Sequence, residues 1–357
     1  MAPTAVVGAG AWGSALAIHL ARLGRAVRLW VFEPELAALI AERRENPWYL
    51  PGVPIPPEAT PTSSLEEVVA EASCVIVAVP SHVFRGVATR LVACAPDGVP
   101  VVSATKGLEE GTQQRMSEIL DSLTGGTRPV AALSGPTFAL EVAQGLPTAA
   151  VLAAREPEVA SGLQQALSSP SLRFYTQTDL VGVELGGALK NVMAIAAGLS
   201  DGLELGTNAR AALLTRGLAE ITRLGVALGA RPATFAGLAG LGDLVLTCTG
   251  PLSRNRRLGI ELGQGRPLAE ILGATRAVVE GVRTTAAALA LGARHGVSLP
   301  ITTEVGAVLF EAKPPRQALA SLLARQARTE EEPGEAPGGP PLIAAPGRGR
   351  RGREHRA

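Results

Sequence analysis

The chain has 357 residues, of which 46% are hydrophobic and 18% charged, with a formal net charge of +1. This allows one or two domains with a sizeable core and gives no reason to expect a nucleic-acid or membrane partner. No basic signal segment opens the chain, we find no apolar run of the roughly 20 residues that span a bilayer, and three scattered cysteines suit a reducing cytoplasm.

The first stretch with a recognisable pattern is TAVVGAGAWG, over Thr4–Gly13. A short apolar strand leads into a glycine turn, and an apolar helical pattern follows at once. In a G-x-G-x-x-G turn, Gly8 permits the bend, Gly10 lets the backbone approach a pyrophosphate, and Gly13 lets helix and strand pack closely. The pattern predicts a dinucleotide site, with the phosphates at the helix N-terminus.

A second strand pattern over 26–30 supports that prediction. It ends near Glu33, 20 positions after Gly13, where an acid is expected to bind the adenosine ribose. The alternative is a glycine turn that binds no ligand, but spacing, order and the acid all favour the dinucleotide site.

Strand and helix alternate through the first half of the chain, interrupted by a proline-rich loop over 46–61. The alternation predicts a doubly wound, mostly parallel Rossmann-type sheet. Ligands of such sheets lie beyond the carboxyl ends of the strands, so the loop that carries Lys106 is expected to face the same crevice as the glycine turn. Further strands are expected over 74–79, 99–103, 130–133, 148–152 and 172–175.

After about Asp179 the strand pattern stops and Ala-, Leu- and Gly-rich helical spacing takes over. We therefore predict three parts: a dinucleotide-binding domain over 1–178, an all-helical substrate domain over 179–327 and a disordered tail over 328–357. The tail, rich in proline, glycine and arginine, has too little apolar surface to fold alone.

Lysine is scarce, because only Lys106, Lys190 and Lys313 occur among the 33 cations. Arginine serves elsewhere, yet its pKa is too high for proton transfer, whereas burial can lower that of lysine. Lys190 lies among apolar helical neighbours, which favours a general acid or base. The alternative is a lysine whose stem is buried and whose ammonium reaches water.

Two further segments carry candidate site residues. Asp243 is the single charge in an apolar segment and is a candidate partner for Lys190, or else a helix cap. Ser253, Arg254 and Asn255 have the pattern of a helix N-terminus suited to a phosphate, or else of a basic surface patch. The four histidines are not paired at ligand spacing, so no metal is predicted.

These motifs, in order, resemble the bacterial NAD(P)-dependent glycerol-3-phosphate dehydrogenases over about residues 4–323. The quoted segments are GAGAWGSALA, VPSHVF, ATKGLE, SGPTFA, GVELGGALKNVMAIAAG, NARAALLTRGLAE, GLAGLGDLVLTC, SRNRRLG and VVEGVRT. The resemblance implies reduction of dihydroxyacetone phosphate to sn-glycerol 3-phosphate with NADH or NADPH, feeding glycerophospholipid synthesis.

The resemblance also implies roles for individual residues. Lys190 is implied as the proton donor and acceptor. The implied substrate residues are Lys106, Gly135, Thr137, Lys190, Asp243, Ser253, Arg254 and Asn255. The implied cofactor residues are Ala11, Trp12, Lys106, Ala139, Arg254, Val278 and Glu280, beside Gly8, Gly10, Gly13, Phe32 and Glu33 from the turn and the second strand.

One position departs from many family members. Where those carry a cation for the 2′-phosphate of NADPH, this chain has Phe32 followed by Glu33. An acid there favours a free 2′-hydroxyl, so NADH is expected to serve at least as well as NADPH, unless Arg44 swings in.

Two other functions stay open at this point. A β-hydroxyacid or 6-phosphogluconate-type dehydrogenase shares the domain order and the lysine, although the SRNRR and SGPTFA segments argue against it. A non-catalytic NADH-sensing protein is opposed by the intact Lys190 and Asp243. The family also makes a cytoplasmic homodimer plausible.

Overall fold

The computed structural model describes residues 2–275 and 278–326, and the predicted tail lies outside them. An eight-stranded sheet dominates the first half, in the order β10-β9-β8-β7-β6-β1-β2-β5. All neighbours are parallel except β8 and β9. The strands are β1 (Thr4–Val7), β2 (Val27–Trp30), β5 (Ala59–Thr62), β6 (Cys74–Val77), β7 (Val101–Ser103), β8 (Val130–Ser134), β9 (Thr148–Ala154) and β10 (Leu172–Gln177).

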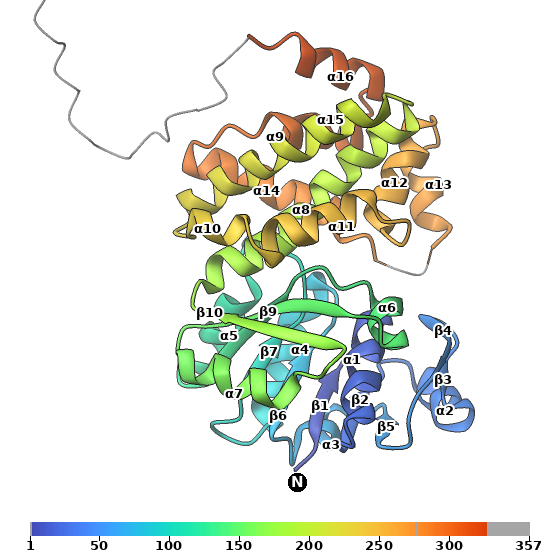
Figure 1. Ribbon diagram of the computed structural model, residues 1–357, viewed down its shortest axis with the longest axis vertical. Helices are drawn as coiled ribbons and strands as arrows, with labels where there is room; N and C mark the ends of the chain where they lie inside the picture. Colours follow the sequence, from blue (N-terminus) through green and yellow to red (C-terminus); the bar gives the residue numbers. More distant parts are fainter. Residues whose placement is uncertain (1, 276–277, 327–357) are drawn as a thin grey trace, which may run out of the picture. The chain divides into compact units, whose positions relative to one another are not determined.

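The order β5-β2-β1-β6-β7-β8 reverses its direction of growth at the β1/β6 boundary. This is the Rossmann arrangement, and the reversal opens a crevice beyond the carboxyl ends of β1 and β6. The predicted doubly wound sheet is confirmed, and Figure 1 shows its strands beside their connecting helices.

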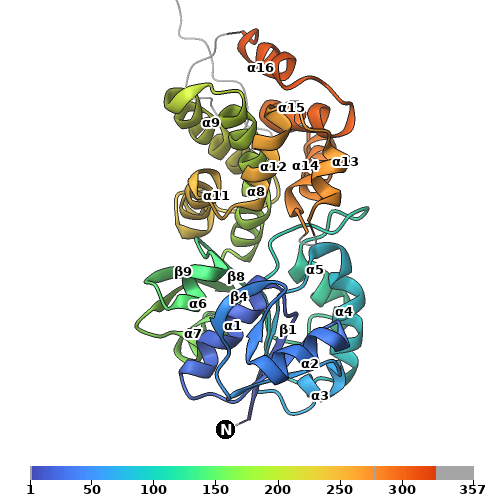
Figure 2. The ribbon, with the colours of Figure 1, turned by 90° about the vertical axis from the view of Figure 1, so that its right-hand side faces the viewer.

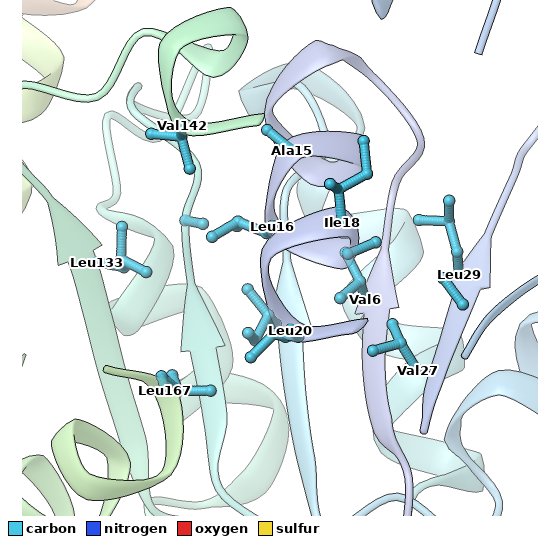
Figure 3. Close-up of a cluster of buried hydrophobic side chains, with 14 of the residues drawn as sticks. Val6, Ala15, Leu16, Ile18, Leu20, Val27, Leu29, Leu133, Val142 and Leu167 are labelled. Carbon is cyan, nitrogen blue, oxygen red and sulfur yellow. The ribbon is translucent and has the colours of Figure 1, made fainter. Parts of the chain in front are cut away.

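Apolar side chains bury both faces of this sheet. One face packs on α1 (Ala11–Arg22), α2 (Pro34–Arg43), α6 (Ala139–Gln144) and α7 (Pro157–Leu167). The other packs on α3 (Leu65–Val69), α4 (Ser81–Cys94) and α5 (Met116–Thr124). Val6 faces the first group of helices and Val7 the second, because successive strand residues point to opposite faces. Figure 3 shows Ile18 of α1 beside Val6 of β1 in this cluster.

The expected proline-rich loop over 46–61 is partly wrong. It contains most of a two-stranded antiparallel hairpin, β3 (Glu45–Asn46) and β4 (Leu50–Pro54), and the edge strand β5. Pro61 lies within β5, where proline is tolerated because the strand pairs only on one side, with β2.

From Leu180 the described chain is helical, as predicted, around the central helix α8 (Leu180–Gly202), which Figure 2 shows among its neighbours. Asp179 caps α8 by accepting from the Gly182 N–H. The division at residue 178 stays a prediction. The other helices are α9 (Gly206–Ala227), α10 (Pro232–Phe235), a π-helical turn η1 (Leu238–Gly242), α11 (Asp243–Thr249), α12 (Arg254–Gly263), α13 (Leu268–Gly273), α14 (Glu280–His295), α15 (Pro300–Phe310) and α16 (Pro315–Leu323).

The expectation that no apolar segment is long enough to span a membrane is wrong, because two segments are long and apolar enough by length and composition alone. Leu180–Gly202 has 23 residues and contains an 18-residue stretch with a mean hydropathy of 1.4, and Pro232–Thr249 also qualifies. Of these apolar stretches, 94% of the first is buried and 44% of the second. Burial of α8 inside the helical region accounts for its apolar composition, since a helix that is hydrophobic all round is buried either in a protein core or in a membrane.

Glycines bring α8 and α12 into backbone contact. A Cβ added to Gly259 would lie 2.1 Å from the Ile195 carbonyl oxygen, and one added to Gly198 would lie 2.0 Å from the Arg256 oxygen. Since backbone, unlike a flexible side chain, has nowhere to move, neither position admits alanine without displacing a helix.

Gly259→Ala is therefore expected to lower the free energy of unfolding by about 2–3 kcal/mol, the usual cost of overpacking. The measurement is the denaturant midpoint at unchanged slope. The control is Gly162→Ala in α7, where an added Cβ meets nothing within 4 Å. Equal stability of the two variants would contradict the close approach of α8 and α12.

Candidate functional site

The glycine turn has the geometry of a phosphate cradle. Gly8 adopts φ +112°, and a Cβ on Gly13 would lie 1.8 Å from the Gly8 oxygen, whereas one on Gly10 would meet nothing within 4 Å. Only glycine fits at positions 8 and 13, whereas the space beside Gly10 is open to a ligand. Gly10 is the N-cap of α1 and supplies no side-chain acceptor, so the N–H groups of Ala11, Trp12 and Gly13 have no partner within the helix.

A buried indole beside this turn also lacks a protein partner. Trp12 Nε1 is buried, and no described residue accepts its hydrogen. Buried donors are normally satisfied, so this N–H is suited to a bound ligand. Free helix-terminal donors, an orphaned indole and open space above Gly10 together fit a dinucleotide.

Lys106 follows β7 and contacts both the segment after β8 and the start of α11. Its Nζ donates to the Gly135 carbonyl at 2.7 Å, to Thr137 Oγ1 at 3.2 Å and to Asp243 Oδ2 at 2.7 Å. An ammonium has three N–H donors, so this one is fully occupied. Four of the implied substrate residues, Lys106, Gly135, Thr137 and Asp243, are thus joined through the Lys106 ammonium. Their contact with substrate stays a prediction.

Lys190 lies on α8 and shares the same carboxylate. Its Nζ donates to Asp243 Oδ1 and, at 2.8 Å, to Thr247 Oγ1. Among the described residues these are its two hydrogen-bond partners, so one of its three N–H donors is left for a ligand. Its ammonium does not reach water by snorkelling, since Lys190 is only 7% exposed.

Burial lowers the pKa of Lys190 from its ordinary value to about 8. The Asp243 carboxylate opposes this shift, and the charge of Lys106 adds to it. Desolvation disfavours the ammonium, while the neighbouring anion favours it. The result is a lysine that exchanges its proton within about one unit of neutral pH.

Two glycines and a π-helical turn bring these groups together. A Cβ on Gly187 would lie 2.4 Å from Ser134 Oγ, so glycine lets α8 approach the end of β8. Gly186 similarly approaches the Ala239 carbonyl of η1. The π-helical turn immediately precedes Asp243, which begins α11, and π-helical turns often occur at functional sites. Gly242, not Asp243, is the cap of α11, so the helix-cap alternative is wrong.

The predicted helix N-terminus at Ser253 is confirmed. Ser253 caps α12 by accepting from the Arg256 N–H, and it is buried with Asn255, while Arg254 is exposed. The two other cations of the segment form ion pairs, Arg256 with Asp201 and Arg257 with Glu261.

Sequence analysis missed a buried amide relay through Asn191. Its Nδ2 donates to the Lys106 carbonyl at 3.3 Å, and its Oδ1 accepts from Asn255 at 2.9 Å. Asn255 in turn accepts from the Gly281 N–H at 3.0 Å. The relay links α12 and α14 to the Lys106 loop beside Lys190. An amide within an apolar helix, next to the candidate lysine, was the available signal.

The expected cofactor residues lie at several places around the sheet edge. Glu280 begins α14 and accepts from the Ser81 N–H and hydroxyl, at 2.9 and 2.6 Å, at the start of α4. Ala139 begins α6, and Val278 lies two residues before α14. Phe32 is 73% exposed beyond the end of β2.

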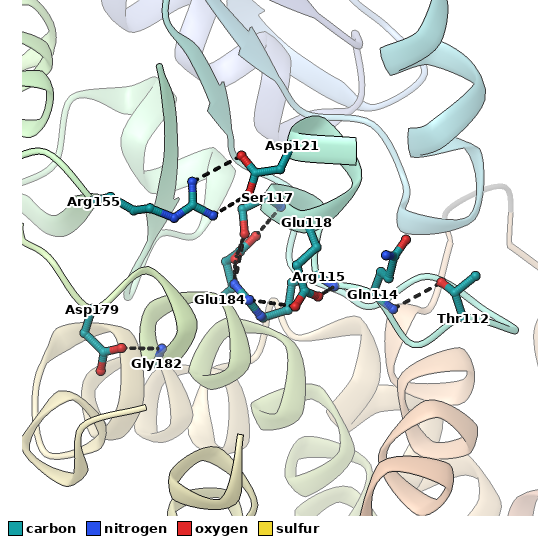
Figure 4. Close-up of polar contacts among 10 residues, drawn as sticks. All are labelled: Thr112, Gln114, Arg115, Ser117, Glu118, Asp121, Arg155, Asp179, Gly182 and Glu184. Carbon is teal, nitrogen blue, oxygen red and sulfur yellow. Dashed lines mark hydrogen bonds and ion pairs between the residues drawn. The ribbon is translucent and has the colours of Figure 1, made fainter. Parts of the chain in front are cut away.

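A second interaction missed from sequence ties α8 to the sheet region. The buried Glu184 accepts from Arg115 and from both the N–H and the hydroxyl of Ser117, at the start of α5 (Figure 4). Glu184 lies six positions before Lys190 on α8. This contact therefore helps fix where α8 presents the lysine.

The fold and the turn define a dinucleotide-binding protein with a helical second region. Two family models match the chain: "NAD-dependent glycerol-3-phosphate dehydrogenase N-terminus" over 3–160 and the corresponding C-terminus over 179–320. The chain belongs to the NAD-dependent glycerol-3-phosphate dehydrogenase family.

Individual relatives agree with the family models. Glycerol-3-phosphate dehydrogenase [NAD(P)+] from Moorella thermoacetica is 50% identical over 93% of this chain and 98% of that protein. The protein of that name from Koribacter versatilis is 52% identical over 92% and 99%. The crystal structure of glycerol-3-phosphate dehydrogenase from Coxiella burnetii is 41% identical, with a TM-score of 0.87, over 91% of this chain and 99% of that one.

The electrostatics of the lysine pair can be measured directly. With only three lysines in the chain, ¹³C-labelled lysine gives few side-chain NMR resonances, and Lys190→Ala identifies the relevant one. Lys190 is expected to titrate near pH 8, and lower in Asp243→Asn, which removes the anion that favours its charge. Titration near the ordinary value of about 10.4 would contradict the burial argument.

Proposed function

We propose that this chain reduces dihydroxyacetone phosphate to sn-glycerol 3-phosphate, reversibly, with NADH or NADPH, and so feeds glycerophospholipid biosynthesis. The observation that carries the proposal is the unequal lysine pair on Asp243. Lys106 has its three donors occupied, whereas Lys190 has one left and a pKa near 8.

Lys190 is the proton donor in this proposal. The reduced nicotinamide supplies the hydride that the substrate's carbonyl carbon accepts. Negative charge develops on the carbonyl oxygen, and Lys190 passes one proton from Nζ to that oxygen. Lys190 then regains a proton from solvent. In the reverse direction neutral Lys190 takes the proton from the hydroxyl.

Asp243 and Lys106 support that transfer. Asp243 holds both ammonium groups and orients Lys190, with Thr247 as its second contact. Lys106 stabilises the developing oxyanion by its charge, in a site where burial weakens screening. Gly135 and Thr137 hold Lys106 and line the substrate position.

The phosphate of the substrate binds at the N-terminus of α12. Ser253, Arg254 and Asn255 supply a hydroxyl, a guanidinium and an amide there, with free helix N–H groups behind them. Asn255 is coupled through Asn191 to the Lys106 loop, so phosphate binding and placement of the lysine pair are linked.

The dinucleotide binds along the sheet edge from the glycine turn to α14. Its pyrophosphate meets the N-terminus of α1, and its adenosine end meets Phe32 and Glu33. The proposed contacts are Gly8, Gly10, Ala11, Trp12, Gly13, Phe32, Glu33, Lys106, Ala139, Arg254, Val278 and Glu280.

The family match over both halves favours this function over the hydroxyacid and sensor alternatives. We further propose that the protein acts in the cytoplasm, as a homodimer, on a free small-molecule substrate.

Lys190→Ala is expected to lower kcat for dihydroxyacetone phosphate reduction by about 10³-fold, because the substrate oxygen loses its proton donor. Steady-state oxidation of NADH measures this. Lys313→Ala is the matched control, since that lysine pairs with Glu304, away from Asp243. Full turnover by Lys190→Ala would move the proton donor elsewhere, and no turnover by the intact chain would overturn the proposed reaction.

The cofactor preference is a separate prediction. Since Glu33 repels a 2′-phosphate, kcat/KM for NADH is expected to equal or exceed that for NADPH at saturating dihydroxyacetone phosphate. Parallel assays with both nucleotides measure the ratio. A strong preference for NADPH would contradict the role given to Glu33.

A further inference from the structure

The hairpin formed by β3 and β4 lies against the glycine turn. Asn46, which is 1% exposed, donates from Nδ2 to the Ala9 carbonyl and to Ser14 Oγ, both at 2.8 Å. Its Oδ1 accepts from the Trp48 and Tyr49 N–H groups at 3.3 and 3.1 Å. One buried amide therefore fixes the segment 46–49 to the turn that cradles the pyrophosphate.

The same segment reaches the second part of the nucleotide site. The Tyr49 hydroxyl donates to Glu33 Oε1 at 3.1 Å. Glu33 lies three residues after β2 as the N-cap of α2, and its own side chain makes no capping bond. Its carboxylate is thus held from outside the β2–α2 connection, with acceptor capacity left on Oε2 and on the second lone pair of Oε1.

Arg44, the cation that could otherwise bind a 2′-phosphate, makes its hydrogen bonds within the β3–β5 region. Arg44 donates to the backbone carbonyls of Ile55, Pro56 and Ala59. Releasing it would leave these carbonyls without a charged donor and would undo the connection from β4 to β5. The expectation that Arg44 could swing towards the nucleotide is opposed by this arrangement.

We propose that Tyr49 is a positioning residue that sets the choice between NADH and NADPH by holding the Glu33 carboxylate towards the adenosine ribose. The inference rests on the dinucleotide site proposed above and adds a residue to it. A held carboxylate accepts hydrogen bonds from a 2′,3′-diol. It also repels a 2′-phosphate, because it cannot rotate away at low cost.

Without the Tyr49 hydroxyl, Glu33 keeps its charge but gains rotamer freedom. Binding of the diol then carries the entropic cost of ordering the Glu33 side chain, whereas a 2′-phosphate is repelled less because the carboxylate can rotate away. Both changes reduce the preference for the nucleotide with a free 2′-hydroxyl. Neither alters Lys190 or Asp243, so kcat with NADH stays the same.

The test compares Tyr49→Phe with Tyr175→Phe. These are the only two tyrosines, and Tyr175 lies on β10, half exposed. Calorimetry gives the Kd of ADP-ribose and of its 2′-phosphate derivative, without substrate or turnover. Tyr49→Phe is expected to reduce the preference for ADP-ribose by about fivefold, the size of the net contribution of one ordinary hydrogen bond, while Tyr175→Phe leaves it unchanged.

Glu33→Gln separates this role from a general loosening of the hairpin. If Tyr49 acts through the Glu33 charge, Tyr49→Phe changes the preference in the parent but not in the Glu33→Gln background. Equal weakening of both ligands, or the same shift in both backgrounds, would overturn the inference. Failure of the intact chain to bind either ligand would instead overturn the dinucleotide site itself.

Discussion

The structure of the candidate site depends on the sharing of one carboxylate by two ammonium groups. Asp243 is 1% exposed and contacts Lys106 through one oxygen and Lys190 through the other. Burying a single anion is costly, and burying two cations beside it is costlier still unless every group is paired. The three charges hold together elements distant in sequence: the loop after β7, the middle of α8 and the start of α11. The same arrangement leaves the lysines unequal, which is what a proton donor beside a fixed positive charge requires.

Much of the remaining structure serves to bring α8 close enough for this contact. Gly186 and Gly187 let the helix meet η1 and the end of β8, and Gly198 lets it meet α12. Glu184 ties the first turns of α8 to the start of α5, and Asn191 ties its centre to α12. Lys190 is thus fixed from several directions, and α12, where we propose that the phosphate binds, is connected through Asn255 and Asn191 to the Lys106 loop.

The sheet and the glycine turn could be predicted because their signals are local. An apolar strand followed by G-A-G-A-W-G specifies strand, turn and helix with no knowledge of distant residues. Lys190 and Asp243 could also be singled out, since each is a charge isolated in an apolar segment. The hairpin over β3 and β4 could not, because its prolines matched a loop and its main contacts are Asn46 to the turn and Tyr49 to Glu33. Contacts between residues far apart in sequence, such as Glu184 and Ser117, produce no periodic pattern in the sequence and so could not be predicted from it.

The most direct test of the account is the pH dependence of kcat/KM in both directions, which reports ionisations of the free enzyme. Reduction requires the Lys190 ammonium, and oxidation requires the neutral amine. The account predicts that reduction falls and oxidation rises as pH passes through about 8. Reduction that stays constant from about pH 7 to pH 9.5, a range that brackets this pKa, would contradict a buried lysine as the proton donor.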